Sequence, residues 1–150
     1  MKPLGRSLFW ITWPLIWLYA PLYLRPRILV ICGDEFLAVK PYFGSGEWQL
    51  PGGGIHSGES EKSAAVRELA EETNLKVDEA IVTLLLPATR YIEKGVRKRY
   101  SIFYVEVVEK SALRPQKNEI GEVAWLPTSI IRADFAFHVT AALQRLQAAA

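Results

Sequence analysis

The chain has 150 residues, a net charge of +2, an apolar half and a single cysteine, Cys32. This length predicts one domain with a substantial core, and this composition excludes an intrinsically disordered chain. The small net charge gives no reason by itself to expect a nucleic-acid binder. A lone cysteine excludes an internal disulfide and is typical of a reducing compartment, where we expect an inert core thiol.

Residues 7–24 form an uncharged, apolar stretch near the start of the chain. As a helix it would span about 27 Å, close to the roughly 30 Å hydrocarbon core of a bilayer. Its tryptophans and tyrosines suit a membrane interface, although Pro14 and Pro21 weaken a straight spanning helix. We therefore assign residues 1–26 to an apolar N-terminal segment that either contacts a membrane or packs on its own domain or across a homodimer. We expect the protein in the cytoplasm, at the inner face of the membrane in the first case.

Residues 27–150 predict one folded domain of strands and helices. Two apolar runs, 28–32 and 35–40, flank a Gly33-Asp34 turn and predict a hairpin, and residues 47–50 predict a short strand before three glycines. Ser60 is the expected N-cap of a helix over 61–73. Residues 81–91 and 99–108 predict two long strands joined by a turn at Gly95, residues 122–126 a further strand, and residues 134–148 a closing helix.

Three glutamates, Glu68, Glu71 and Glu72, stand at i, i+3 and i+4 spacing in the helix expected over 61–73. This spacing places the carboxylates within about 100° of arc, beside the apolar face of the helix and without overlap. Like charges so placed repel one another, so the cluster indicates a hard divalent cation that neutralises it. A solvated helix face is the ordinary alternative.

The residues around these glutamates resemble the signature of the Nudix hydrolases, G-x5-E-x7-R-E-U-x-E-E-x-G-U, in which U is aliphatic. Five residues separate Gly53 from Glu59, and seven separate Glu59 from the run RELAEETNL at 67–75. Every fixed position matches except the second glycine, which is Asn74 here. Asn is the residue that most often replaces glycine in the left-handed conformation that ends a helix. The preceding residues 48–52, WQLPG, also resemble the family.

The resemblance implies an α/β/α sandwich with a mixed central sheet, to which residues 1–26 would be an addition. It implies hydrolysis of the diphosphate bond in a nucleoside diphosphate linked to another group, with Mg²⁺ or Mn²⁺ as cofactor. The three glutamates would be metal ligands or catalytic carboxylates, one of them a general base. Gly53 would let the backbone approach the metal, Arg67 would hold the loop and Glu59 in place, and Asn74 would be structural.

Further candidates lie outside the signature. Glu119 and Glu122 could each supply another carboxylate, and we favour Glu119 because its spacing before Trp125 resembles that of a general base in some members of the family. Residues 90–99 carry a net charge of +4, which suits an extended phosphate, an acidic membrane surface or a solvated hairpin. The candidate substrate-binding residues are Trp48, Arg90 and Tyr91, with core packing as the alternative for the aromatic rings.

We therefore expect a metal-dependent pyrophosphohydrolase that acts on a nucleotide-type small molecule. Nucleic acid is expected as a partner only in the form of capped or 5′-phosphorylated RNA. One alternative is a nucleotide-sensing module that binds its ligand without turnover. Damage to the signature would indicate such a module. The other is a hydrolase of a lipid-linked diphosphate, reached through residues 7–24.

Overall fold

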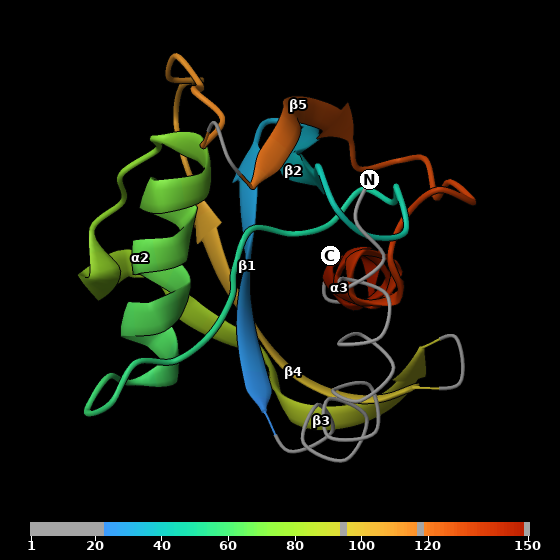
Figure 1. Ribbon diagram of the computed structural model, residues 1–150. Coiled ribbons are helices and arrows are strands. Elements are labelled where there is room, and N and C mark those ends of the chain that lie inside the picture. Colours follow the sequence, from blue (N-terminus) through green and yellow to red (C-terminus); the bar gives the residue numbers. More distant parts are fainter. Residues whose placement is uncertain (1–22, 94–95, 117–118, 149–150) are drawn as a thin grey trace, which may run out of the picture.

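The structure is a computed structural model that describes residues 23–93, 96–116 and 119–148. In these residues a five-stranded sheet lies between two helices, with α2 on one side of strand β1 and α3 on the other (Figure 1). The strand order is β3-β4-β1-β2-β5, and the sheet is mixed because β1 runs parallel to β4 and the other neighbours are antiparallel. The expected α/β/α sandwich with a mixed central sheet is confirmed.

The expected hairpin is formed by β1 (Leu24–Cys32) and β2 (Glu35–Pro41). Gly33, between these strands, has a φ of 61°, a left-handed conformation that glycine adopts without steric cost. The other strands are β3 (Thr83–Glu93), β4 (Val96–Glu106) and β5 (Ile120–Pro127). The predicted start of the third strand at residue 81 was wrong, because Glu79–Ile81 form a 3₁₀-helix whose N-terminus is capped by the Asp78 side chain.

Helix α2 (Glu61–Thr73) has the predicted bounds, because both of its ends carry local signals. The Ser60 hydroxyl accepts a hydrogen bond from the Ser63 N–H at the N-terminus. Asn74 ends the helix with a φ of 63°, the left-handed conformation expected for this position.

Helix α3 (Phe137–Gln147) begins three residues later than the predicted start at residue 134. Residues 133–134 form a turn, and the segment around it bonds to Trp48: the Trp48 N–H donates to the Asp134 carbonyl, and the Ala136 N–H donates to the Trp48 carbonyl. This pairing links two segments that are far apart in sequence. Helical periodicity could not have revealed it.

Two apolar cores fill the space between the sheet and the helices. On one face Ile28 and Val30 of β1 pack with Leu69 of α2, and on the other Leu29 of β1 packs with Val139 of α3. All five side chains are fully buried, which makes β1 the central strand of the domain. Strand β1 therefore supplies side chains to both faces of the sheet.

The helix expected within residues 7–24 lies mostly outside the described residues, and so does the turn at Gly95. Leu24, at the end of that stretch, begins β1 instead. Within the described part of the chain, none of the helices has the length and apolar character needed to cross a bilayer.

Candidate active site

The loop from Leu50 to Gly54 is fixed against the N-terminal half of β1, which β2 does not pair with. The Ile28 N–H donates to the Pro51 carbonyl, and Arg27 Nη1 donates to the carbonyls of Leu50 at 3.0 Å and Gly52 at 2.6 Å. Only glycine fits at position 52, because a Cβ atom there would lie 2.2 Å from the Pro26 carbonyl oxygen. The loop is thus held close to β1, with its backbone next to α2.

His138, in the first turn of α3, holds the same loop from the α3 side of the sheet. Its Nε2 accepts a hydrogen bond from the Leu50 N–H at 3.2 Å, and its ring lies 4.9 Å from that of Tyr100. Burial lowers the pKa of His138 well below its ordinary value, so the imidazole is neutral. His138 therefore acts as a buried hydrogen-bond acceptor that joins α3 to the loop.

Arg67 of α2 organises the acidic residues of the signature. Its Nε and Nη2 donate to the two carboxylate oxygens of Glu59 at 2.9 and 3.1 Å, and Nη2 also donates to the Gly54 carbonyl at 2.8 Å. Its Nη1 donates to Glu68 at 3.0 Å and to Glu71 at 3.1 Å. Bonding to Arg67 lowers the pKa of Glu59 to about 2, so Glu59 stays ionised at neutral pH. One guanidinium thus fixes the loop through Gly54 and orients Glu59, Glu68 and Glu71.

Glu72 has a different environment from the other two glutamates. It is 8% exposed, whereas the side chain of Glu71 is 49% exposed. Burial raises the pKa of Glu72 to about 7, against the opposing effects of Arg27 and of the Gly52 N–H, which donates to Glu72 at 2.9 Å. The expectation that all three carboxylates lie clear of the packed surface was therefore wrong for Glu72, because the docked loop covers it.

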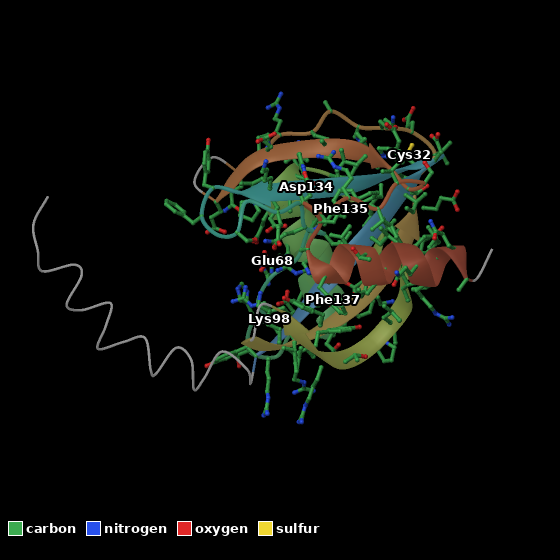
Figure 2. The ribbon with its side chains drawn as sticks, turned by 90° about the vertical axis from the view of Figure 1, so that its right-hand side faces the viewer. Cys32, Glu68, Lys98, Asp134, Phe135 and Phe137 are labelled. Atoms are coloured by element: carbon green, nitrogen blue, oxygen red, sulfur yellow. The ribbon has the colours of Figure 1, made fainter. Side chains whose placement is uncertain are left out.

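A cavity of about 560 Å³ opens between this loop, the sheet and the start of α3. Four carboxylates line it, those of Glu47, Glu68, Glu72 and Glu119, and Gly53 is also part of the lining. Strands β1 and β4 bring cationic side chains to the same cavity, and Figure 2 shows Glu68 and Lys98 at the end of α3 that carries Phe137. The cavity is therefore lined by groups of both charge signs.

The predicted site residues fall into two groups in the structure. Glu68, Glu72, Glu119 and Gly53 line the cavity, while Glu59, Glu71 and Arg67 form the hydrogen-bonded network beside it and Asn74 caps the helix. The predicted substrate-binding residues are not brought to the cavity. Trp48 is 7% exposed in the core on the α3 face, Arg90 is exposed to solvent, and Tyr91 contacts the rings of Tyr100 and Phe137.

The cavity also contains residues that were not predicted. Arg25 and Arg27 project from β1, and Tyr100 projects from β4. Arg25 and Arg27 alternate with Leu24 and Pro26, a period-2 pattern that could have revealed them had the strand been assigned from residue 24.

The donor set of the cavity fits a hard divalent cation, although no preformed cluster of three ligating side chains exists within the described residues. Glu68, Glu72 and Glu119 offer only oxygen atoms, which Mg²⁺ and Mn²⁺ prefer. The charges of Glu68 and Glu119 both raise the pKa of Glu72, so each of them repels an ionised Glu72. A bound cation would remove this repulsion.

Comparisons with known proteins agree with this geometry. Residues 23–144 match the family model described as the NUDIX domain. An RNA pyrophosphohydrolase of Tolumonas auensis is 37% identical over 78 residues, which cover 50% of this chain and 43% of that protein. A putative 8-oxo-dGTP diphosphatase 2 of Mycobacterium tuberculosis is 48% identical over 44 residues, which cover 29% of this chain and 31% of that protein. The chain thus aligns with less than half the length of these curated relatives.

A solved structure has the same fold at low sequence identity. The NUDIX domain of Shewanella oneidensis NrtR, crystallised with ADP ribose, aligns with a TM-score of 0.72 at 18% identity. The alignment covers 85% of this chain and 87% of that one. This likeness concerns the fold of the domain.

Proposed function

The chain belongs to the NUDIX domain family, and on that premise we propose that it hydrolyses a diphosphate bond in a nucleoside diphosphate linked to another group. The observation that carries the proposal is the convergence of Glu68, Glu72 and Glu119 on one cavity beside Gly53. The curated relatives are named as an RNA pyrophosphohydrolase and a putative diphosphatase of 8-oxo-dGTP, both of which fit this reaction class.

We propose Mg²⁺ or Mn²⁺ as the cofactor, held by Glu68, Glu72 and Glu71, with the backbone at Gly53 close by. When bound, such an ion polarises a phosphoryl oxygen and lowers the pKa of its water. Arg67 is a positioning residue, because it ties Glu68 and Glu71 to the loop through Glu59 and Gly54.

Two carboxylates are candidates for the general base that takes a proton from the attacking water. Glu119 lines the cavity from the segment before β5 and is exposed to solvent. Glu72 could take this role if the ion is held by Glu68 and Glu71, since burial raises its pKa to about 7 in the metal-free protein. In either case Leu50, Gly52 and Arg27 form a buried wall of the cavity. Bulk water therefore cannot reach the reacting group from the side of this wall.

The test is the effect of removing each carboxylate charge. Substituting Glu68→Gln, Glu71→Gln or Glu72→Gln should lower kcat/KM at least about a hundredfold, because electrostatic stabilisation of the transition state is the largest catalytic contribution in such sites. Glu61→Gln, in the first turn of the same helix and outside the cavity, is the matched control. Parental turnover by all three variants on every active substrate would disprove the mechanism.

A substrate panel measured with Mg²⁺ and with Mn²⁺ tests the reaction class. It should comprise nucleoside triphosphates, nucleotide sugars, ADP-ribose, dinucleoside polyphosphates, and capped or 5′-phosphorylated RNA. We expect metal-dependent release of a nucleoside monophosphate or, from RNA, of a 5′-monophosphorylated chain. Tight binding by calorimetry without hydrolysis of any compound would instead support a nucleotide-sensing module.

Membrane contact through residues 7–24 is a separate proposal, supported by the apolar composition of that stretch. It would place the enzyme at the inner face of a membrane. Fractionation of the full chain against a chain that begins at Tyr23 tests it, since Leu24 already belongs to β1. If neither protein sediments with membranes, the contact does not exist.

A further inference from the structure

Strands β3 and β4 carry a cationic surface that the proposed reaction does not use. Arg90 of β3 is paired with Arg99 of β4. Two residues further along β3, Ile92 is paired with Arg97. Directly paired residues, and residues two apart on one strand, project from the same face of a sheet. Arg90, Ile92 and Arg97 are all exposed, Ile92 by 71%, and none of them lines the cavity. We call these three residues the basic patch.

The basic patch lies on the α2 face of the sheet but beyond the reach of that helix. Phe103, four residues after Arg99 on β4, packs in the same core as Leu69 of α2. The end of the β3–β4 pair that carries the patch lies on the other side of β1 from α2 (Figure 1). Among the side chains that the structure describes, no hydrogen bond or ion pair is found for Arg90 or Arg97. Two cations and an apolar side chain are therefore presented to solvent together.

The apolar stretch of residues 7–24 joins the sheet beside this patch. Leu24 begins β1 and is paired with Arg99, which is paired in turn with Arg90, so the three residues form one row across the sheet. Tyr23, the residue before β1, is 64% exposed. No residue from 7 to 24 carries a charge. An uncharged apolar stretch and a cationic surface thus meet at one end of the sheet.

This combination of groups fits an anionic lipid bilayer better than a nucleic acid. A single apolar anchor gives weak and reversible membrane binding, to which a basic surface adds attraction for acidic headgroups. Ile92 suits the apolar part of the interface, whereas proteins that read single-stranded RNA present aromatic rings for stacking. The neighbouring ring, that of Tyr91, is occupied by contacts with Tyr100 and Phe137.

We propose that the basic patch docks on an anionic membrane surface, next to the point where residues 7–24 contact the bilayer. The inference rests on the membrane contact proposed above and adds a second, electrostatic point of attachment to it. Binding then depends on the charge of the lipid and on ionic strength, which an uncharged apolar stretch alone does not explain.

Co-sedimentation of the full chain with lipid vesicles tests the inference. Vesicles of phosphatidylcholine alone are compared with vesicles that also contain phosphatidylglycerol, an anionic lipid. Arg90→Gln/Arg97→Gln should lower the partition coefficient on the anionic vesicles by roughly tenfold or more and leave that on the neutral vesicles within about twofold. Lys76→Gln/Arg145→Gln removes the same charge from exposed residues outside the patch. This matched control should bind both kinds of vesicle as the parent does.

Hydrolysis of a soluble nucleotide by the same proteins separates this inference from the proposed reaction. Values of kcat/KM should be parental in both double variants, because none of the four substituted residues lines the cavity. A loss of anionic-lipid preference confined to Arg90→Gln/Arg97→Gln supports the docking surface even if no compound is hydrolysed. Equal losses in both double variants, or a parent that binds neither kind of vesicle or both equally, would overturn the inference and leave the reaction standing. Parental vesicle binding with weaker binding of a 5′-phosphorylated RNA would also overturn it and make the patch a nucleic-acid surface.

Discussion

Gly53 lies so close to Glu68 that a Cβ atom at position 53 would come within 2.5 Å of the Glu68 carboxyl carbon. At the neighbouring Gly54, a Cβ atom would meet nothing within 4 Å. Gly53→Ala should therefore displace the Glu68 carboxylate and lower kcat/KM at least about tenfold, because small misplacements of catalytic groups are costly. The free energy of unfolding should change little, since the clash is with the end of a side chain. Gly54→Ala is the control, and equal activity of the two variants would contradict this role of Gly53.

Arg67→Lys tests whether the guanidinium geometry, and not only its charge, positions the acidic residues. A lysine ammonium cannot reproduce the paired contacts with both oxygens of Glu59 together with the bonds to Glu68 and Gly54. We expect kcat/KM to fall by roughly tenfold to a hundredfold, with weaker apparent affinity for Mg²⁺ in a metal titration. Arg97→Lys, on the exposed side of β4, should leave both quantities unchanged. Parental metal affinity in Arg67→Lys would show that charge alone suffices.

The pH dependence of stability should report the buried Glu72. Its pKa is about 7 in the folded protein, against an ordinary value of 4.5. The folded state binds the proton of Glu72 more tightly than the unfolded state does. Protonation of Glu72 therefore contributes its full stabilisation of the fold below pH 4.5, and this contribution is lost as the pH rises through 7. We expect the free energy of unfolding of the metal-free protein to fall by about 3 kcal/mol more than that of Glu72→Gln over this window.

Chemical denaturation in the presence of a chelator measures this difference. Added Mg²⁺ should restore part of the stability above pH 7 in the parent, because a divalent cation binds the ionised carboxylate. Identical pH profiles of the parent and Glu72→Gln would contradict the assignment.

Position 74 offers a test of stability without an effect on chemistry. Asn74 has a φ of 63°, where a side chain with a Cβ atom is strained and where asparagine is tolerated better than alanine. Asn74→Ala should lower the free energy of unfolding by about 1 kcal/mol, and Asn74→Gly should keep or slightly raise it. Thermal or chemical denaturation measures both. Values of kcat and KM should be parental in each variant, and a selective loss of activity in Asn74→Gly would give Asn74 a chemical role.

The elements that the sequence predicted accurately are those with local signals. Ser60 and Asn74 mark both ends of α2, and Gly33 marks the first hairpin. The prediction failed where long-range contacts determine the local structure. Residues 134–136 match a helical pattern but bond to Trp48 instead, which delays the start of α3.

The candidate site could be predicted in part for the same reason. The spacing of Glu68, Glu71 and Glu72 on one helix is local information, whereas the burial of Glu72 depends on a loop docked against β1. Arg25 and Arg27 were not predicted as site residues because they directly follow the apolar stretch of residues 7–24. The face of the sheet from which their side chains project can be deduced only once β1 is known to start at Leu24.

The parallel pairing of β1 with β4 has a consequence for how the protein folds. This pairing joins Leu24 to Arg99, so it requires the closure of a long loop, whereas α2 and the β1–β2 hairpin form from neighbouring residues. Contacts that are distant in sequence form more slowly than local ones. The cavity needs β1, β4 and α2 together, so it is complete only once this long-range pairing has formed.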